Sequence, residues 1–321
     1  MPVATTPHPL RALALGWVVV RAAGAGRGPP VTDARRRLAV LGSPIEHSLS
    51  PVLHRTAYEH LGLPFDYDRV EVASGGLADV VGGLDASWRG LSLTMPLKRE
   101  VLPLLDTVSP LARRLGVANT VVIDDDGRRH GHNTDVDGIV RSVEGFHDAR
   151  PAAATILGGG ATALSAMAAA WDLGARSFSI HLRNPMRAGE LTSLAAELGA
   201  DVMVAPLTEL PSLGPLDFVI STLPGGAADD LHLRPAGGSS VLFDVAYDPW
   251  PTRLASRWST DGGIVFNGLD MLVEQALGQV RLFSGRAQDE PVPDEGVLRD
   301  AMRASVGSPI RDRSTTDSVA R

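Results

Sequence analysis

The stretch "ATILGGGATALSAM", residues 154–167, places three glycines between a β-branched apolar run and an alanine-rich segment. It predicts a strand, a tight turn and a helix, with the pattern Gly158-x-Gly160-x-x-Ala163 at the turn. The first glycine permits the turn, the second lets backbone N–H groups approach a pyrophosphate, and the small third residue lets helix and strand pack closely. Glycines alone are weak evidence, so their position between strand and helix carries the prediction of dinucleotide binding.

The sequence around this loop alternates short β-branched runs with helical patterns, which is typical of an α/β fold with largely parallel sheets. The run "LAVLG" at 38–42 predicts a first buried strand. A helix should follow at 50–63, with Ser50 as its N-cap and Pro51 in the first helical position. Further strands are expected in "FSIHL", "DVMVA", "DFVIST", "SVLFDVA" and "GIVF", and the last helix at 268–283.

These elements divide into two lobes. We expect an N-terminal α/β lobe at 37–137 plus 270–307, and a Rossmann-type, doubly wound parallel-sheet lobe at 138–269. A hinge is expected near "NTDVDG" (133–138), where the chain passes from one lobe to the other. The C-terminal helix should return to the first lobe.

The two ends of the chain differ from the rest in composition. Residues 1–36 and 308–321 are expected to be a disordered extension and a disordered tail. The apolar run "LALGWVVV" at 13–20 is too short to span a bilayer, and its flanks fit a secretory signal poorly. We therefore expect no membrane association.

Overall composition excludes several classes of function. The chain of 321 residues carries a net charge of −7, which argues against nucleic acid as a partner. It has no cysteine, which excludes disulfides, thiolate metal sites and a thiol nucleophile, and fits the cytoplasm. Because Pro51 interrupts the spacing of His47 and His54, we interpret both histidines as structural or capping residues and expect no metal.

The segment "IHLRNPMRAGEL" (180–191) bears on which dinucleotide is bound. NAD sites usually place an acid on the ribose 2′-OH about twenty residues after the glycines. Here Arg183 and Arg187 occupy that region, and no acid occurs before Glu190. Two guanidinium groups can bind a 2′-phosphate, so the sequence favours NADP. The alternative is that both arginines are solvated surface residues.

Polar clusters at 42–51, 92–98 and 117–138 are expected where strands end, which is where open α/β sheets bind ligands. One of them contains Lys98, the only lysine among 30 basic residues. A lysine ammonium can both stabilise a developing oxyanion and give it a proton. Arginine stays protonated and can do only the first. Lys98 is therefore the candidate acid, although a surface lysine kept by chance is the alternative.

These clusters resemble the motifs of the shikimate dehydrogenase family, from about residue 38 to residue 283. "GSPIEHSLSPVLH" matches the family pattern G-x-P-x-x-H-S-x-S-P-x-x-H, and "GLSLTMPLK" matches G-x-[NS]-V-T-x-P-x-K with leucine for valine. "GVANT", "HNTD", the glycine loop, "LRNPMRA", "DVAYDPWPTRL" and "GLDMLVEQA" follow in the family's order. The resemblance implies reduction of 3-dehydroshikimate to shikimate with NADPH, in the pathway to chorismate and aromatic amino acids.

The resemblance also implies roles for individual residues. It makes Lys98 and Asp135 the catalytic pair, with the first lobe as the catalytic domain. The implied substrate-binding residues are Ser48 and Ser50 on the carboxylate, with Ser92, Thr94, Lys98, Asn119, Asp135, Tyr247 and Gln275. The implied NADP-binding residues are Gly158, Gly159, Gly160, Ala161, Thr162, Arg183, Asn184, Arg187, Val245, Gly268 and Met271. Alternative interpretations are an Asx turn or cap for Asp135 and helix capping for the two serines.

Several positions depart from the family pattern. Ser92 stands where many members carry an asparagine, Arg55 follows His54 in place of the frequent asparagine, and Asp270 occupies a position that is usually small or neutral. These departures leave two alternatives open. One is a catabolic quinate/shikimate dehydrogenase using NAD, and the other is a non-catalytic NADP-binding sensor. The expected partner is the small-molecule substrate, and a homodimer is compatible with the sequence.

Overall fold

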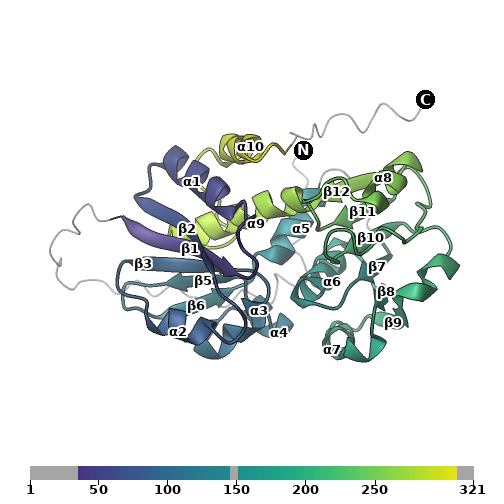
Figure 1. The fold of residues 1–321 in the computed structure, drawn as a ribbon, viewed down its shortest axis with the longest axis horizontal. Coiled ribbons are helices and arrows are strands. Elements are labelled where there is room, and N and C mark those ends of the chain that lie inside the picture. Colours follow the sequence, from purple (N-terminus) through teal and green to yellow (C-terminus); the bar gives the residue numbers. More distant parts are fainter. Residues whose placement is uncertain (1–34, 145–150, 309–321) are drawn as a thin grey trace, which may run out of the picture.

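The computed structural model describes residues 35–144 and 151–308, which form two halves, each built on one six-stranded sheet (Figure 1). The N-terminal extension up to residue 34 and the tail from residue 309 lie outside the described residues. Arg36, assigned from the sequence to the extension, is already the first residue of a strand. The two-lobe α/β architecture predicted from the sequence is confirmed.

The first sheet has the strand order β2-β1-β3-β5-β6-β4. β1 pairs in parallel with β2 and β3, whereas β5 runs antiparallel to both β3 and β6. The start of β5 therefore lies at the same edge as the carboxyl ends of β1 and β3, which brings the cluster around Asn119 to that edge. The strands are β1 (Arg36–Gly42), β2 (Phe65–Glu71), β3 (Trp88–Leu93), β4 (Thr107–Val108), β5 (Thr120–Ile123) and β6 (Arg129–His132).

Helix α1 follows β1, but its start differs from the prediction. Leu49 is the N-cap residue, Ser50 is the first helical residue, and no side chain caps the helix. The hydroxyl of Ser48 accepts from the backbone N–H of Ser50 at 3.4 Å. The Ser50 side chain lines the space between the lobes. The helices of this lobe are α1 (Ser50–Leu61), α2 (Leu77–Gly82), α3 (Leu97–Glu100), η2 (Leu102–Leu104) and α4 (Pro110–Leu115).

The second sheet has the order β12-β11-β10-β7-β8-β9, and all its strands are parallel. The order reverses between β7 and β10, which is the topological switch point at which such sheets bind dinucleotides. The predicted Rossmann-type arrangement is thus confirmed. The strands are β7 (Ala153–Leu157), β8 (Ser177–Leu182), β9 (Asp201–Pro206), β10 (Phe218–Ser221), β11 (Val241–Asp244) and β12 (Ile264–Asn267).

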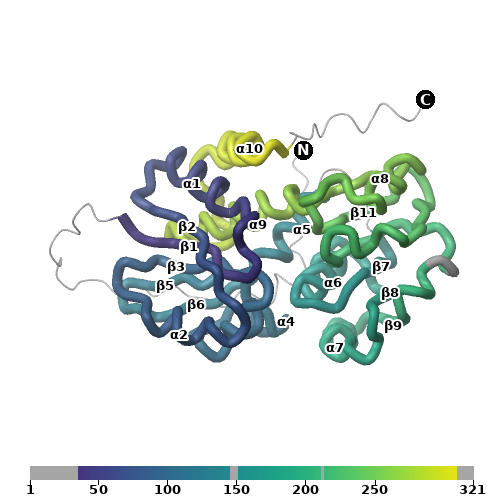
Figure 2. Tube along the Cα trace, viewed as in Figure 1, coloured from purple at the N-terminus to yellow at the C-terminus, as the bar shows by residue number. Residues whose placement is uncertain are grey.

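Two helices join the lobes: the chain leaves the first lobe through α5 and returns through α9 (Figure 2). Val273, Leu277 and Val280 of α9 pack in the core of the first lobe, which confirms the predicted return of the C-terminal helix. Helix α10, which the sequence analysis missed, then packs on α1 and α9. These helices are α5 (Asp135–Val143), α6 (Ala161–Leu173), η3 (Pro185–Arg187), α7 (Gly189–Leu198), η4 (Leu207–Ser212), α8 (Arg253–Thr260), α9 (Gly268–Phe283) and α10 (Glu295–Ser305).

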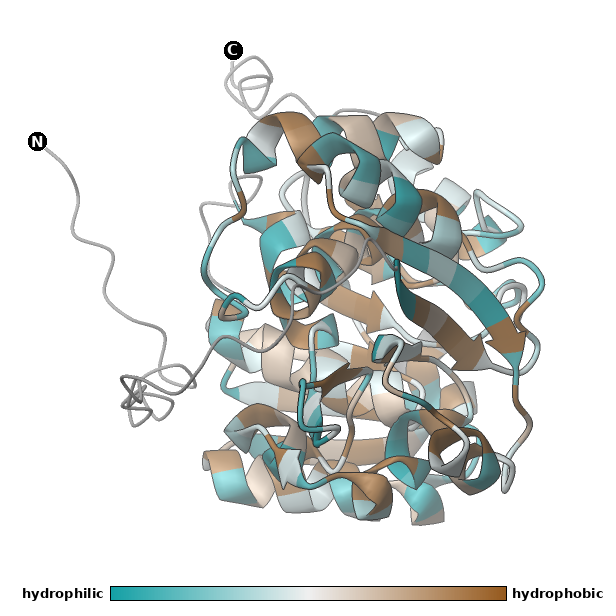
Figure 3. Ribbon diagram, turned by 90° about the vertical axis from the view of Figure 1, so that its left-hand side faces the viewer, coloured by the Kyte–Doolittle hydropathy of each residue, from teal (hydrophilic) through white to brown (hydrophobic). Residues whose placement is uncertain are grey.

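Hydrophobic residues concentrate on the strands and on the inner faces of the helices (Figure 3). Each sheet is covered on both faces, as expected for strands with continuous apolar runs. Helix α5 contributes Ile139 and Val140 to the core of the second lobe, while its first residue points back to the first. The junction between the lobes is therefore built from packed helices.

Candidate active site

A cavity of about 320 Å³ lies between the two lobes at the carboxyl ends of β1 and β3. Its walls combine the loop after β1, the loop after β3 and one face of α9 with residues of the second lobe. Twelve residues that the resemblance implied line it: Ser48, Ser50, Ser92, Thr94, Lys98, Asp135, Thr162, Val245, Tyr247, Gly268, Met271 and Gln275. The structure thus brings together segments that lie far apart in the sequence.

Lys98 and Asp135 form a buried ion pair on the wall of this cavity. The Nζ atom of Lys98 donates to Oδ2 of Asp135 at 2.6 Å, and their side chains are 11% and 4% exposed. Lys98 is held on the short helix α3 because its carbonyl accepts from the N–H of Ala118 at 2.9 Å. The ammonium group therefore lies beside a carboxylate and at a cavity, and does not extend into bulk water.

Asp135 does not form the Asx turn that was its alternative interpretation. The carboxamide oxygen of Asn133 makes that turn by accepting from the backbone N–H of Asp135 at 3.0 Å and of Val136 at 3.3 Å. Asp135 is the first residue of α5, and its carboxylate accepts hydrogen bonds from other side chains. Its Oδ1 atom accepts from Nδ2 of Asn119 at 2.8 Å, so both oxygens have a donor.

Asn119 lies behind the cavity rather than on its surface, since it is 1% exposed. Besides Asp135, its Nδ2 atom donates to Oε1 of Gln275 at 3.2 Å, and its Oδ1 atom accepts from the N–H of Thr134 at 2.9 Å. These contacts fix the orientation of its amide. In this arrangement Asn119 supports Asp135 and Gln275, which themselves line the cavity.

Hydroxyl groups also line the cavity. Ser48 and Ser50 come from the loop after β1, and Thr94 from the loop after β3. Tyr247 is contributed by the loop after β11, and burial raises the pKa of its phenol, which stays protonated at neutral pH. Hydroxyl groups that share a cavity with an ammonium–carboxylate pair suit a small, polyhydroxylated anion.

The glycine loop has the geometry that a pyrophosphate requires. Gly158 adopts φ +109°, and a Cβ atom there would lie 2.4 Å from Oγ1 of Thr222. A Cβ atom on Gly160 would meet no atom within 4 Å, so the loop faces open space on that side. Helix α6 starts at Ala161 without a side-chain cap, which leaves its first N–H groups for an anion. The residues present therefore fit a dinucleotide.

Arg183 and Arg187 lie on the exposed segment that follows β8, and Asn184 between them accepts from the N–H of Met186 at 3.1 Å. The first acid after them, Glu190, forms an ion pair with Arg99 of the other lobe. Since Glu190 is engaged there, the residues close to the end of β8 are cationic. This arrangement suits a 2′-phosphate better than a free ribose hydroxyl.

The start of α9 closes the cavity on the cofactor side. A Cβ atom on Gly268 would lie 2.1 Å from the carbonyl oxygen of Val245, so only glycine fits there. Asp270, which departs from the family pattern, has a structural explanation. It forms a capping box with Asn267 and pairs with Arg303 of α10 at 3.0 Å, so it points away from the cavity.

Several residues that the sequence analysis did not assign are part of the site. Pro44, Ile45, Leu272 and Gln279 line the cavity, and His54 and Tyr67 lie directly behind it. Only Gln279 had a usable signal, because it follows Gln275 by four residues on a predicted helix and must share its face. His54 is fully buried, and burial lowers its pKa to about 3, so it is a neutral structural residue.

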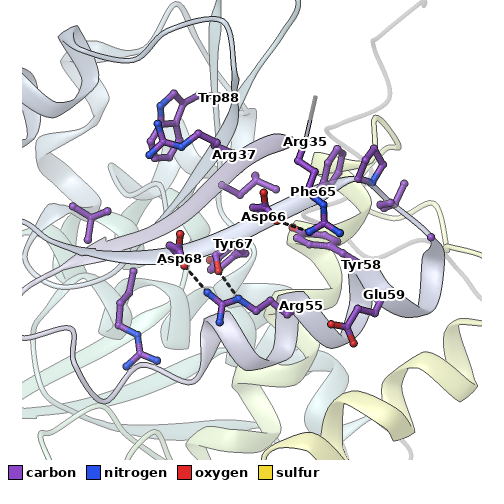
Figure 4. A pocket seen from close by; sticks show the side chains of 16 residues that line it. Arg35, Arg37, Arg55, Tyr58, Glu59, Phe65, Asp66, Tyr67, Asp68 and Trp88 are labelled. Atoms are coloured by element: carbon purple, nitrogen blue, oxygen red, sulfur yellow. Dashed lines mark hydrogen bonds and ion pairs between the residues drawn. The ribbon is translucent and has the colours of Figure 1, made fainter. Parts of the chain in front are cut away.

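A larger hollow of about 1050 Å³ lies at the edge strand β2, away from these groups (Figure 4). Two ion pairs form between the residues that line it. Arg55 donates to the carbonyl of Tyr67 at 2.9 Å and pairs with Asp68, and Arg35 pairs with Asp66. Arg55 thereby occupies one backbone acceptor of the edge strand, which disfavours the addition of another strand at this edge.

The described residues offer neither a metal site nor a membrane-spanning helix. Between residues 35–144 and 151–308, no three His, Asp or Glu side chains lie close enough to hold a metal ion together. Over the same ranges, no helix combines the length and the apolar character needed to cross a lipid bilayer.

Comparisons with known proteins agree with this geometry. Residues 40–121 match the family model described as the shikimate dehydrogenase substrate binding domain. The shikimate dehydrogenase (NADP(+)) of Moorella thermoacetica is 34% identical over 86% of this chain and 97% of its own length. The crystal structure of Mycobacterium tuberculosis shikimate dehydrogenase is 34% identical, with a TM-score of 0.72, over 85% of this chain and 99% of that one. The Thermus thermophilus enzyme, solved in complex with NADP(H) and shikimate, is 30% identical with a TM-score of 0.68, over 84% and 99% of the two chains.

Proposed function

Because the chain belongs to the shikimate dehydrogenase family, we propose that its cavity catalyses the NADPH-dependent, reversible reduction of 3-dehydroshikimate to shikimate, with Lys98 and Asp135 as the catalytic pair. The chain is an NADP-dependent oxidoreductase of this family, and the step it contributes belongs to chorismate biosynthesis. The catabolic, NAD-linked alternative is not favoured by these relatives.

The observation that carries the proposal is the 2.6 Å contact between Nζ of Lys98 and Oδ2 of Asp135 at the cavity wall. When bound, NADPH supplies a hydride to the C3 carbonyl of the substrate. The Lys98 ammonium stabilises the charge that grows on the carbonyl oxygen and donates the proton that completes the hydroxyl. The carbonyl thereby gains one hydride and one proton, and the Lys98 amine regains its proton from solvent.

Asp135 has two tasks in this proposal. It holds the Lys98 ammonium in place, and it accepts a hydrogen bond from a ring hydroxyl of the substrate. Its second oxygen is already occupied by Asn119, so the carboxylate keeps one orientation through the reaction. The Lys98 ammonium that it holds is therefore already in place when charge develops on the substrate oxygen. Such preorganised donors are effective in catalysis because they need no reorganisation.

The remaining residues divide between substrate and cofactor. Ser48 and Ser50 bind the substrate carboxylate, and Ser92, Thr94, Tyr247 and Gln275 surround its ring. Asn119 contributes from behind the cavity by holding Asp135 and Gln275. The glycine loop (Gly158, Gly159, Gly160, Ala161 and Thr162) holds the pyrophosphate. Arg183, Asn184 and Arg187 hold the 2′-phosphate, and Val245, Gly268 and Met271 border the nicotinamide. On this assignment the domains are 37–137 plus 270–307 for the substrate and 138–269 for NADP.

Two finer statements belong to the same proposal. The cytoplasm is the proposed location, because the chain has no cysteine and its relatives are biosynthetic enzymes. A homodimer is the proposed assembly, which a sedimentation measurement on the full chain would test.

The direct experiment supplies the purified full chain with shikimate and either NADP⁺ or NAD⁺ and follows the absorbance of the reduced nicotinamide. Rapid turnover with NADP⁺, and slower turnover with NAD⁺, is expected. Quinate in place of shikimate is the control for the catabolic alternative. Turnover that is faster with quinate and NAD⁺ would favour that alternative, and no turnover of either would leave the binding-sensor interpretation.

A further inference from the structure

A continuous chain of buried hydrogen bonds runs behind the cavity from Ser92 to Asp135. The hydroxyl of Ser92 meets Oε1 of Gln279 at 2.9 Å, and Nε2 of Gln279 meets Oγ1 of Thr120 at 3.0 Å. Thr120 contacts Oδ1 of Asn119 at 2.9 Å, and Asn119 reaches Asp135. All five side chains are at most 3% exposed. The two ends of the chain, Ser92 and Asp135, both line the cavity.

A backbone carbonyl fixes the direction of the bonds that Gln279 makes in this chain. Nε2 of Gln279 also contacts the carbonyl oxygen of Asn119 at 3.3 Å, and a carbonyl can only accept. The amide of Gln279 therefore cannot be reversed, since reversal would place two oxygens against each other. Its Oε1 atom must face Ser92, so the Ser92 hydroxyl donates its single hydrogen to Gln279.

The aromatic cluster behind the wall reinforces this direction. Nε2 of His54 approaches the same Oε1 atom of Gln279 at 3.1 Å, while Nδ1 approaches the hydroxyl of Tyr58 at 2.9 Å. With a pKa of about 3, His54 is neutral and donates only from Nε2. The hydroxyl of Tyr67 donates to Oγ of Ser92 at 2.7 Å. Gln279 thus receives two donors and Ser92 receives one.

The hydrogen bonds of Ser92 are therefore almost fully committed. A serine hydroxyl has one hydrogen and two acceptor lone pairs. The hydrogen goes to Gln279 and one lone pair accepts from Tyr67, which leaves a single lone pair for the cavity. Ser92 can accept from a ligand but cannot donate to it.

We propose that Gln279 is a specificity-determining positioning residue: by consuming the Ser92 hydrogen, it makes a hydroxyl donor obligatory at the ring position that faces Ser92. The inference rests on the proposed function for the identity of the ligand, a hydroxylated cyclic carboxylate. A substituent that can only accept, such as a fluorine, a carbonyl or an ether oxygen, meets a lone pair at that position and is disfavoured.

Fluorinated ligands test this directly, because fluorine keeps the approximate size of a hydroxyl and loses its hydrogen. Equilibrium binding of shikimate, 4-deoxy-4-fluoroshikimate and 5-deoxy-5-fluoroshikimate is measured calorimetrically on the full chain. At one of the two positions the wild-type protein should bind the fluorinated ligand roughly 5- to 150-fold more weakly, the range for leaving a buried polar group unsatisfied. In Gln279→Met the Ser92 hydrogen is released, and this penalty should fall by about tenfold or to nothing.

Three variants separate the hydrogen-bond effect from damage to packing. Gln279→Glu keeps an acceptor for Ser92 and should keep the penalty, even if the protein is less stable. Gln288→Met removes another half-buried glutamine, which donates to the carbonyl of Asn133 at 3.0 Å without touching Ser92, and should also keep it. Ser92→Ala removes the acceptor, so the penalty should disappear at the same ring position as in Gln279→Met. This variant replaces Gln279→Met in the test if Gln279→Met does not fold.

An equal penalty in the wild type, Gln279→Met and Ser92→Ala at both positions would overturn the inference. Turnover of shikimate is followed on the same samples, so that the two proposals fail separately. Shikimate that binds without being oxidised contradicts the proposed reaction while the fluorine comparison still decides the role of Gln279. Protein that binds no shikimate overturns both.

Discussion

The two sides of the cavity are built in opposite ways. On the substrate side Lys98, Asp135, Asn119 and Gln279 are buried, and each is held by side-chain hydrogen bonds. On the cofactor side the glycine loop faces open space, and the Arg183–Arg187 segment is largely exposed. The first side is complete before any ligand arrives, whereas the second is completed by the anion that it binds.

This difference assigns different consequences to mutations on the two sides. A preorganised, buried network acts on the transition state and on selectivity, because its geometry is fixed before charge develops. Exposed cations act mainly on affinity, because they gain their partner only when the ligand binds. Changes on the substrate side should therefore lower kcat, and changes on the cofactor side should raise KM for the cofactor.

Replacement of Lys98 should give the largest effect. Lys98→Ala is expected to lower kcat by a factor of about a thousand or more, because it removes both the proton donor and the positive charge beside the forming alkoxide. It also leaves Asp135 buried without its 2.6 Å partner. Binding of NADPH, followed by fluorescence, should change little, since Lys98 lies on the substrate side.

Lys98→Arg is the matched control for charge. Arginine retains the positive charge and cannot release its proton, so the variant should stay well below the wild-type kcat. Turnover near the wild-type value in either variant would show that Lys98 is not the acid. A large loss of NADPH affinity in Lys98→Ala would show that the two sides are not separable.

The same contrast explains how much of the site the sequence could predict. The strand–glycine–helix loop, the bounds of α9 and the residues lining the cavity follow from local patterns and from motif order. Thr120 and Tyr67 carry no such signal, and for Gln279 the sequence indicates only the helix face that it shares with Gln275. Their roles depend on contacts between distant parts of the chain, since Thr120 and Gln279 are 159 positions apart in the sequence. The direction of the hydrogen bonds also depends on the backbone carbonyl of Asn119.

Other errors of the sequence analysis have equally local causes. The pattern of a serine before a proline predicted Ser50 as the N-cap. In the structure Leu49 is the N-cap and Ser50 is the first helical residue. Helix α10 was missed because its place depends on a distant partner: Arg303 pairs with Asp270 and Glu274 of α9. Buried ion pairs between separate helices leave no periodic pattern in the sequence.

On the cofactor side, Arg183→Ala combined with Arg187→Ala is expected to lower kcat/KM for NADPH by about a hundredfold. Each guanidinium–phosphate hydrogen bond is charge-assisted, and two are lost together. With NADH, which has no 2′-phosphate, the loss should be within a few-fold. The measurement is the ratio of kcat/KM values for the two cofactors, with kcat for NADPH at saturation nearly unchanged.

Glu190→Gln is a control on the same segment. It removes an exposed ion pair with Arg99, whose side chains are 60% and 38% exposed, so its effect should be small. Equal losses for NADPH and NADH in the double arginine variant would mean that the arginines do not read the 2′-phosphate. A fall in kcat as large as that of Lys98→Ala would remove the distinction between the two sides.

The smallest of the three effects concerns stability, and its two largest histidine contributions, from His54 and His132, lie in the first lobe, although burial also lowers the pKa of His181 in the second lobe. Burial lowers the pKa of His54 to about 3 and of His132 to about 4, against an ordinary value near 6.5. Between about pH 6.5 and 4.5 these two histidines are therefore protonated in the unfolded chain and neutral in the folded chain. Stability should fall as the pH falls, by about 2–3 kcal/mol for each histidine over this window.

Urea unfolding at several pH values measures this slope, and His132→Asn should reduce it by about the 2–3 kcal/mol that this histidine contributes over the window. His60→Asn, on the exposed last turn of α1, is the matched control and should leave the slope unchanged, because an exposed side chain is equally hydrated in both states. The contribution of Asp244 to the pH dependence of stability has the opposite sign, since burial raises its pKa and the folded chain takes up that proton first as the pH falls.

Stability that stays constant down to about pH 4.5 would mean that water reaches the wall behind the cavity. In that case the fixed hydrogen-bond direction at Ser92, and with it the contrast between the two sides, could not hold.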